Sequence, residues 1–385
     1  MPVIDVDCHF DLTIRPEDHP LKKWADRLPK LEHFIADALT GDLLRSTPDD
    51  ARPDENVLAL YLPDSNRSAA EQSTAPGQFD ARFPQATPAE RIDWFDKVGI
   101  DYALMNPGGW GFLIDYMGED KTEAVRRSND YMADHLDDTS GRMIQVSLID
   151  WDDLERAVAE LERMRARGSR AFWLSTEPSH GVSPAHGEWD RVWSAATDLG
   201  MVAILHVGNT PSHFDGGWGN VQWDMPGGAG LGGFFRFANS LRHHPAEKML
   251  ASMMYGGVFG RHPNLTVITE ELGVSWLPYF IARCDGLSAA GPWAFEASPG
   301  EMVRRNVRAT PLIGLGDPNV AEGLLQQFPD TFVFSSDYPH GEGNADPLRL
   351  YEPALSLLDE SLRQSFLGGN MAECFARMGD PLPEL

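Results

Sequence analysis

Acidic and imidazole side chains stand where predicted strands end, and their spacing suits metal chemistry. In the Asp7-Cys8-His9 segment, strand alternation places Asp7 and His9 on one face and Cys8 on the other. One carboxylate oxygen and one imidazole nitrogen on a shared face suit zinc, manganese or iron. His206 ends a second apolar run, in AILHVGN. Taken alone, the first pair is more typical of a satisfied structural contact, and His206 is more typical of a core histidine bonded to backbone.

The segment FVFSSDYPHGEG carries the most specific single motif of the chain. Its apolar and β-branched residues predict a buried strand that ends at Asp337. A buried carboxylate is costly unless it is paired or bound to a metal, so Asp337 becomes a candidate ligand. His340 follows three residues later and is predicted either as a second acid or base or as a surface loop histidine.

The elements that must position these side chains alternate regularly between strand and helix. Several predicted helices end in glycine just before the next apolar run, as at Gly99 in KVGIDYALMN. The predicted strands are Val3–His9, Asp101–Asn106, Met143–Ile149, Arg170–Ser175, Met201–Val207, Leu265–Glu270, Leu312–Leu315 and Thr331–Ser336. The predicted helices include Pro88–Val98, Thr122–Asp137, Asp152–Ala166, Gly187–Leu199 and Val274–Asp285. Eight such strands predict an α/β fold, a (β/α)8 TIM barrel formed as a single domain over residues 1–385. A doubly wound open sheet is the alternative, weakened because no GxGxxG or GxxxxGK[ST] turn follows a strand.

Three stretches interrupt this alternation. Residues 11–87 follow strand one and residues 209–233 follow strand five, and both are predicted to be insertions that form a lid. A third stretch, Ala289–Pro311, follows the helix after strand six. Aromatic residues in or near the lid segments predict an apolar or planar substrate, or alternatively pack the insertions onto the barrel: Trp110, Phe112, Phe214, Trp218 and Trp223.

The bulk composition excludes several classes of partner. The formal net charge is −26, which disfavours nucleic acid and anionic membrane surfaces. No run of about 18 apolar residues predicts a membrane span, and the acidic amino terminus does not fit a signal peptide, so a cytoplasmic location is expected. The three cysteines have no CxxC spacing, which argues against disulfides and structural zinc.

The motifs together resemble the amidohydrolase-related family, which includes the aminocarboxymuconate semialdehyde, resorcylate and carboxyvanillate decarboxylases. The resemblance rests on the Asp-x-His pair, His206, the SDYPH segment and the stretch Pro263–Tyr279, and it spans Val3 to about Pro347. It implies that one divalent ion is held by Asp7, His9, His206 and Asp337, with zinc as the first choice and manganese or iron as alternatives. Strand four, RAFWLS, offers no lysine for the carbamate bridge of binuclear relatives. A divalent ion lowers the pKa of the water it holds, and Asp337 is expected to accept that proton.

One departure from the family pattern concerns strand six. Where several decarboxylases carry a histidine that handles a proton, this chain has Glu271, whose neighbour Glu270 is expected to point the other way. Glu271 either performs acid–base catalysis or orients a ligand histidine by a hydrogen bond.

The resemblance implies a metal-dependent enzyme that hydrolyses or decarboxylates a small, aromatic or carboxylated metabolite. The alternatives are a metal-assisted dehydration or cyclisation in a biosynthetic pathway, and a barrel that binds a metal or ligand without turnover. Relatives are commonly dimers, and Phe234–Gly257, with Met249, Met253 and Met254, is predicted as either a subunit interface or core.

Overall fold

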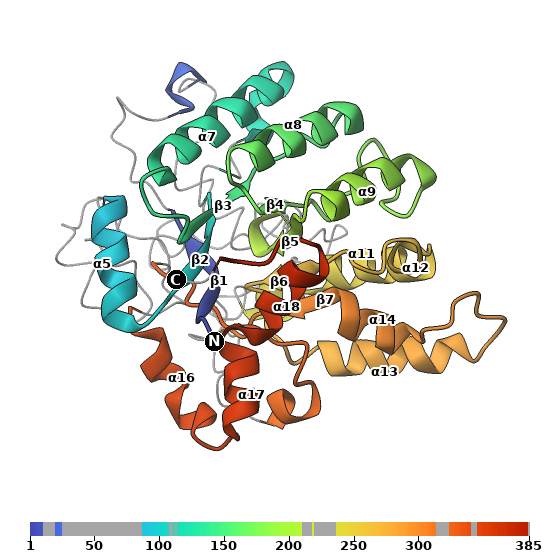
Figure 1. Ribbon diagram of the computed structural model, residues 1–385. Helices are drawn as coiled ribbons and strands as arrows, with labels where there is room; N and C mark the ends of the chain where they lie inside the picture. The colour runs from blue at the N-terminus through green and yellow to red at the C-terminus, as the bar shows by residue number, and fades with distance from the viewer. Residues whose placement is uncertain are drawn as a thin grey trace, which may run out of the picture.

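A parallel sheet lies at the centre of the molecule, with helices around it (Figure 1). The computed structural model describes residues 1–10, 20–24, 87–107, 111, 114–209, 218, 236–312, 323–339 and 345–383. The strands are β1 (Ile4–His9), β2 (Tyr102–Asn106), β3 (Met143–Ser147), β4 (Ala171–Trp173), β5 (Val202–His206), β6 (Val267–Glu270) and β7 (Val307–Ala309). They pair in chain order, all parallel, and the sheet is curled, which confirms the prediction of a (β/α)8 barrel.

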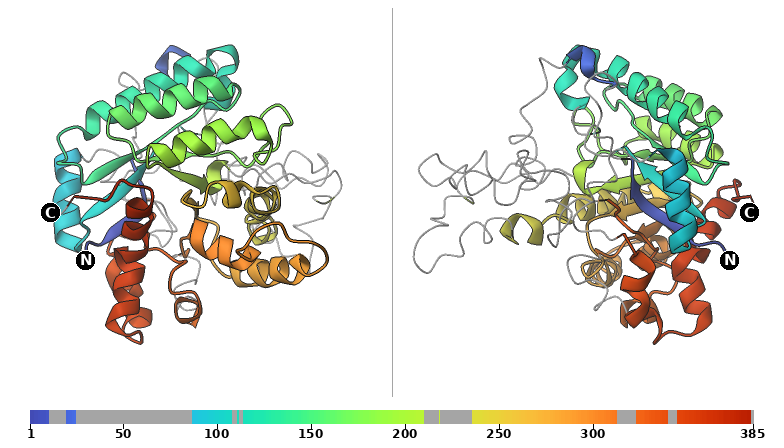
Figure 2. Two further views of the ribbon diagram at one scale, coloured as in Figure 1. Left: turned by 45° about the vertical axis from the view of Figure 1, so that its right-hand side comes forward. Right: turned by 90° about the vertical axis from the view of Figure 1, so that its left-hand side faces the viewer.

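Helices follow the strands and cover the outer side of the sheet, as the two views of Figure 2 show. The α-helices are α5 (Pro88–Val98), α7 (Lys121–Leu136), α8 (Leu154–Ala166), α9 (Asp190–Asp198), α11 (His244–Tyr255), α12 (Val258–Arg261), α13 (Leu277–Ser288), α14 (Pro299–Asn306), α16 (Pro347–Leu355), α17 (Glu360–Gln364) and α18 (Asn370–Arg377). Short turns of other helix types are η1 (Lys22–Trp24), η3 (Ile114–Asp120), η4 (Gly187–Trp189), η5 (Val207–Asn209) and η7 (Ser365–Gly369). Helix α5 has the predicted bounds because Thr87 and Glu90 form a capping box and Gly99 ends the helix in the left-handed region, at φ 82°.

The ring closes through an extended segment rather than through a regular eighth strand. Residues 331–338 lie between β7 and β1, where Val333 N–H donates to the Ala309 carbonyl and Val6 N–H donates to the Phe334 carbonyl, both at 3.1 Å. Two isolated bridges, Ala309 with Phe332 and Cys8 with Tyr338, mark the two seams. The predicted strand Thr331–Ser336 therefore occupies the expected place without forming a continuous ladder.

The predicted seventh strand, Leu312–Leu315, lies outside the described residues except for Leu312, which is not in a strand. Strand seven is β7, a few residues upstream and inside the stretch Ala289–Pro311 that was not assigned to the barrel. Its central residue is Arg308, which disguises the strand because charged side chains are rare in buried strands. The Arg308 guanidinium donates to the Arg304 carbonyl and to the Glu373 carboxylate, and these contacts make its burial tolerable.

Two further predictions meet the structure unequally. Met249, Met253 and Met254 are buried in α11, so this part of Phe234–Gly257 packs into the core. The two lid insertions, 11–87 and 209–233, fall almost entirely outside the described residues. Within the described part of the chain, no helix is both long and apolar enough to cross a membrane.

Candidate metal centre

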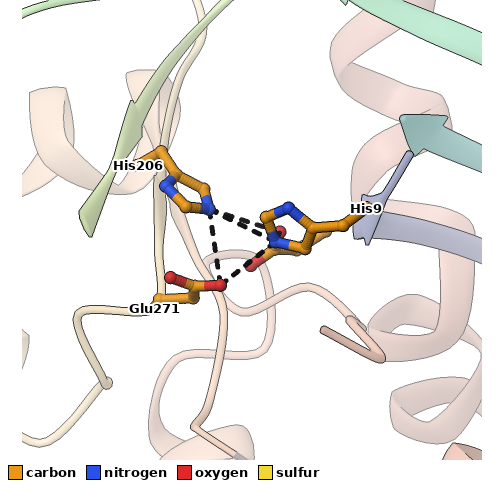
Figure 3. A group of neighbouring side chains, drawn as sticks. His9, His206 and Glu271 are labelled. Atoms are coloured by element: carbon orange, nitrogen blue, oxygen red, sulfur yellow. Dashed lines mark hydrogen bonds and ion pairs between the residues drawn. The ribbon is translucent and has the colours of Figure 1, made fainter. Parts of the chain in front are cut away.

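Two imidazoles and three carboxylates converge at the carboxyl ends of the strands. The His9 Nε2 atom lies 3.2 Å from an Asp7 oxygen, 3.1 Å from a Glu271 oxygen and 3.3 Å from an Asp337 oxygen. The His206 Nε2 atom lies 3.3 Å from His9 Nε2 and 3.4 Å from the same Glu271 oxygen. Figure 3 shows the two imidazoles and the Glu271 carboxylate pointing toward one another. All five side chains are buried, so their charges are poorly screened by water.

Parallel strands bring these residues together from distant parts of the sequence. Asp7 and His9 lie near the end of β1, His206 ends β5 and Glu271 directly follows β6. Asp337 lies in the segment that closes the ring, where its N–H donates to the Asp7 carbonyl at 2.7 Å. In barrels of this kind, the carboxyl ends of the strands form the active-site face.

The backbone turns sharply at both of the acids that follow strands. Glu271 has φ 55° and Asp337 has φ 50°, in the left-handed region that side-chain-bearing residues rarely adopt. Such a conformation costs of order 1–3 kcal/mol and is concentrated at functional sites. At Glu271 this turn ends the strand alternation and returns the side chain to His9.

Consequently the expectation that Glu270 and Glu271 point opposite ways is wrong. Glu270 is in register with His206, and residues paired in a parallel sheet share a face. The Glu270 carboxylate accepts a hydrogen bond at 2.9 Å from the Asn106 amide, which also donates to Asp7. Both glutamates therefore belong to this region, Glu271 among the donor atoms and Glu270 on the Asn106 amide.

The buried negative charge demands a cation or protons. Burial, followed by the nearby charge of Asp7, raises the pKa of Glu270 well above its ordinary value. Burial likewise raises the pKa of Asp5 to about 7. Among the described residues, Asp7 Oδ2 and Glu270 Oε1 have no hydrogen-bond partner although both atoms are buried. A divalent cation fits this donor set, because it would neutralise part of the negative charge of the clustered, buried carboxylates.

The arrangement brings together most of the predicted site residues. Asp7, His9 and His206 join Glu271 in a buried group whose donor atoms all lie within 4.8 Å of one another. Donor atoms that share one ion at 2.0–2.1 Å lie roughly 3 Å apart, close to the spacing around His9 Nε2. Asp337 approaches the group through His9, whereas His340 lies outside the described residues.

Two residues of the centre were missed from the sequence. Asn106 ends β2 and donates 2.8 Å and 2.9 Å hydrogen bonds to Asp7 and Glu270. Trp173 of β4 stacks on the His206 ring, with centroids 4.8 Å apart. Asn106 could have been found by the signal that identified His206, because YALMN, like VAILH, is an apolar run that ends in a polar side chain.

Comparisons with known proteins agree with this architecture. A family model described as amidohydrolase matches residues 4–377. An amidohydrolase from Mycobacterium avium subsp. paratuberculosis is similar in structure, with a TM-score of 0.62 and 20% identity over 97% of this chain and 99% of that one. A 5-carboxyvanillate decarboxylase from Novosphingobium aromaticivorans, complexed with manganese and 4-hydroxy-3-methoxy-5-nitrobenzoic acid, has a TM-score of 0.64 and 17% identity over 97% and 96%. A dihydroxybenzoic acid decarboxylase from a Polaromonas species, with bound manganese and the inhibitor 2-nitroresorcinol, has a TM-score of 0.59 and 15% identity over 97% of each chain. The family resemblance predicted from the motifs is confirmed, and since the family model matches nearly the whole length, the chain belongs to the amidohydrolase family.

Proposed function

We propose that the protein is a metal-dependent enzyme that decarboxylates a small hydroxylated aromatic carboxylate. The observation that carries this proposal is the convergence of Asp7, His9, His206, Glu271 and Asp337 at the active-site face of the barrel. Two structurally similar proteins are decarboxylases of aromatic acids, and each holds manganese beside a nitrophenol-type ligand. The chain shares the fold of these proteins, and its buried carboxylates and imidazoles offer donor atoms that could hold a divalent ion in the same way.

The ion that we propose is one manganese, held by Asp7, His9, His206 and Asp337, with Glu271 as a further donor. Three carboxylates and two imidazoles make an oxygen-rich set, which suits manganese better than zinc, the first choice that the family resemblance implied. When bound, a divalent cation supplies the positive charge that stabilises negative oxygens of the substrate and of the transition state. A homodimer in the cytoplasm stays a prediction from sequence.

The protein's own residues would manage the proton. In decarboxylation the bond between ring carbon and carboxyl carbon breaks, carbon dioxide leaves, and the ring carbon takes up one proton. Glu271 lies at the donor cluster where a substrate would be held, 3.1 Å from His9, and its carboxyl group would deliver this proton to the ring carbon. Asp337, 3.3 Å from His9 in the segment that closes the ring, would serve as the base that the sequence predicted.

Hydrolysis is the second candidate, and the strand-six residue favours it. Glu271 stands where several decarboxylases have a histidine, and a carboxylate is a competent general base toward water. In that case Asp337 or Glu271 would accept a proton from the attacking water. The dehydration or cyclisation considered from sequence has no separate observation in its favour.

The test begins with protein purified without added metal or affinity nickel. Metal content is measured by plasma mass spectrometry, and carbon dioxide release is followed with 2,6-dihydroxybenzoate, 5-carboxyvanillate and related hydroxybenzoates, beside aryl esters. About one ion per chain, with turnover that a chelator abolishes and manganese restores, supports the proposal. An Asp337→Asn variant that keeps full metal content and full turnover would contradict the role given to Asp337. Cleavage of esters alone would replace decarboxylation by hydrolysis.

A further inference from the structure

The buried side-chain amide of Asn106 connects the candidate ligand Asp7 to Glu270 and Trp173. Asn106 is fully buried at the end of β2, where it is in register with His9 across the first strand pair. Its Nδ2 atom donates to Asp7 Oδ1 at 2.8 Å and to Glu270 Oε2 at 2.9 Å. Its Oδ1 atom accepts from the Trp173 indole N–H at 2.7 Å. The side chain thus joins β1, β2, β4 and β6 through three short hydrogen bonds.

The chemistry of an amide makes this arrangement directional. A side-chain amide has two N–H donors on nitrogen and lone pairs only on oxygen. Both donors of Asn106 meet carboxylates, which only accept when ionised, and its oxygen meets an indole, which only donates. Rotating the amide by a half turn would set its oxygen against Asp7 and Glu270 and its N–H groups against the indole. The Trp173 indole therefore fixes which way the amide faces.

Trp173 is itself held on several sides. Its ring stacks on His206, with centroids 4.8 Å apart and an interplanar angle of 23°, and its carbonyl accepts from the Trp151 indole at 3.1 Å. A Cβ added at Gly111 would lie 2.1 Å from the Trp173 ring, so the backbone of residue 111 packs directly against its edge. The ring has little freedom to move, and its N–H direction is correspondingly fixed.

We infer that Asn106 is a positioning residue of the metal centre, oriented by Trp173, and that it sets the geometry of Asp7 while holding the Glu270 carboxylate on its amide. This inference rests on the proposed function, because it assumes that Asp7 and His206 bind a cation. Asn106 donates to Asp7 Oδ1, the same oxygen that lies 3.2 Å from His9 Nε2, so its hydrogen bond fixes the position of the oxygen that faces the donor cluster. Hydrogen bonds of this kind to ligating carboxylates typically change metal affinity by 10- to 100-fold.

The consequence for Glu270 is equally specific. An unrestrained Glu270 would be a second acid beside Glu271 and could compete for the ion or repel Asp7. The Asn106 donor gives the Glu270 carboxylate a partner within the barrel interior, 2.9 Å away. Asn106 thereby keeps two adjacent glutamates in different roles.

The experiment measures cobalt binding to the full-length, metal-depleted protein by competition with a chromophoric chelator. Visible absorption of bound cobalt reports ligand geometry, and unfolding of the metal-free protein reports stability separately. The variants are Asn106→Ala, Trp173→Phe and the double variant. Trp173→Phe keeps an aromatic ring beside His206 but removes the N–H that orients the amide together with part of the ring, so a control with the same loss of ring elsewhere is needed beside it.

The chain offers a matched control for each variant. Asn129 of α7 is also a buried amide with both donors and its acceptor used, on the Leu148 backbone and Glu160, away from the centre. Trp193 of α9 is buried and donates its indole N–H to the Pro184 carbonyl at 2.8 Å. Asn129→Ala and Trp193→Phe therefore remove the same kinds of bond without touching the metal centre.

We expect Asn106→Ala to weaken cobalt binding by about 10- to 100-fold and to alter the cobalt spectrum. Trp173→Phe should weaken binding by a smaller factor, and should add little in the Asn106→Ala background, because the indole acts through the amide. Both control variants should bind cobalt as the parent does, whatever their stability. Equal affinity in Asn106→Ala and the parent, or independent effects in the double variant, would overturn the inference while leaving the proposed function intact. A parent protein that binds no cobalt would overturn both.

Discussion

Among the described residues, two groups combine a pair of histidines with one or more acids, and only the buried group fits a metal site. In the described part of the chain, the buried group is Asp7, His9, His206 and Glu271, and the other is His243, His244 and Glu247. In each group the donor atoms lie within 4.8 Å of one another. The first is assembled from three strands, whereas the second occupies the first turn of α11 and is half-buried or exposed. Proximity of donor atoms is therefore common to both and does not distinguish them.

Charge and burial make the difference. The first turn of a helix carries a partial positive charge, which opposes a cation at the α11 group. His243 stacks on Trp276 with ring centroids 5.7 Å apart, and burial, aided by His244, lowers the pKa of His243 to about 4. In the central group, further buried acids surround the histidines and Glu270 has a raised pKa. A cation would relieve the buried charge of the central group, whereas the α11 group has one acid at a partly exposed helix end and has less need of one.

The strongest test of the difference between the two groups removes one histidine from each. We expect His9→Ala to lower kcat/KM at least about a thousandfold and to abolish stoichiometric metal, because a ligated cation supplies several kcal/mol of transition-state stabilisation. His244→Ala should retain metal and turnover. Metal analysis and steady-state kinetics on the same preparations check both. Metal loss from His244→Ala with retention in His9→Ala would reverse the assignment.

The acids give the next largest contrast. Glu271→Gln keeps the shape of the side chain and removes its charge. Loss of a residue that only hydrogen-bonds to a ligand weakens metal binding by about 10- to 100-fold, and loss of a donor atom should weaken manganese binding at least as much. Glu247→Gln in α11 should leave the affinity unchanged. Titration calorimetry with manganese distinguishes the two. Unchanged affinity in Glu271→Gln would restrict Glu271 to proton handling.

A smaller effect, the rise in melting temperature on metal binding, also tests which group holds the ion. Manganese at about a hundred times its Kd should stabilise the folded protein by about 2.7 kcal/mol, since it binds the folded state alone. For a chain of 385 residues the melting temperature should rise by about 3 °C in the parent and in His244→Ala. No rise is expected in a His9→Ala, His206→Ala double variant. Differential scanning calorimetry with and without the ion measures the shift, and an equal rise in the double variant would locate the ion elsewhere.

The smallest effect concerns pH and the α11 group. The folded pKa of His243 is about 4 against an ordinary value of 6.5, so between these values the unfolded chain binds more protons than the folded one. Stability should therefore rise with pH across this window and be lost as the pH falls from 6.5 toward 4. In His243→Gln the slope should decrease by up to about one proton. Urea unfolding of both proteins at several pH values tests this, and parallel curves would contradict it.

Much of the fold could be predicted from the sequence because local signals agree with the tertiary structure. Thr87, Glu90 and Gly99 mark both ends of α5, and the predicted strand Met201–Val207 differs from β5 by one residue at each end. Strand seven could not be predicted because Arg308 interrupts its apolar pattern and is satisfied only by groups distant in sequence, such as Glu373. Short strands with one charged residue depend on tertiary contacts for their identity.

The metal centre, like the fold, could be predicted only in part from the sequence. Asp7, His9, His206 and Asp337 could be proposed from the sequence because each follows or ends an apolar run. Their convergence confirms the layout, while their role as ligands stays a prediction. Glu270 could not be placed, because the left-handed backbone at Glu271 breaks the alternation on which the expectation rested. Asn106 and Trp173 lacked any local signal of their joint role, since that role exists only once β2, β4 and β6 are side by side.

The closing segment between β7 and β1 also determines when, during folding, the candidate metal centre can form. The hydrogen bond from Asp337 N–H to the Asp7 carbonyl joins residues from opposite ends of the chain. During synthesis the acids of β1 are made long before Asp337 and lack this neighbour until the closing segment has also been made. Contacts so distant in sequence form late and slowly, since loop closure precedes any gain from pairing. A chain that has not yet reached this segment lacks Asp337, so under the proposed function it would lack one of the expected ligands and would hold the ion less tightly than the folded barrel.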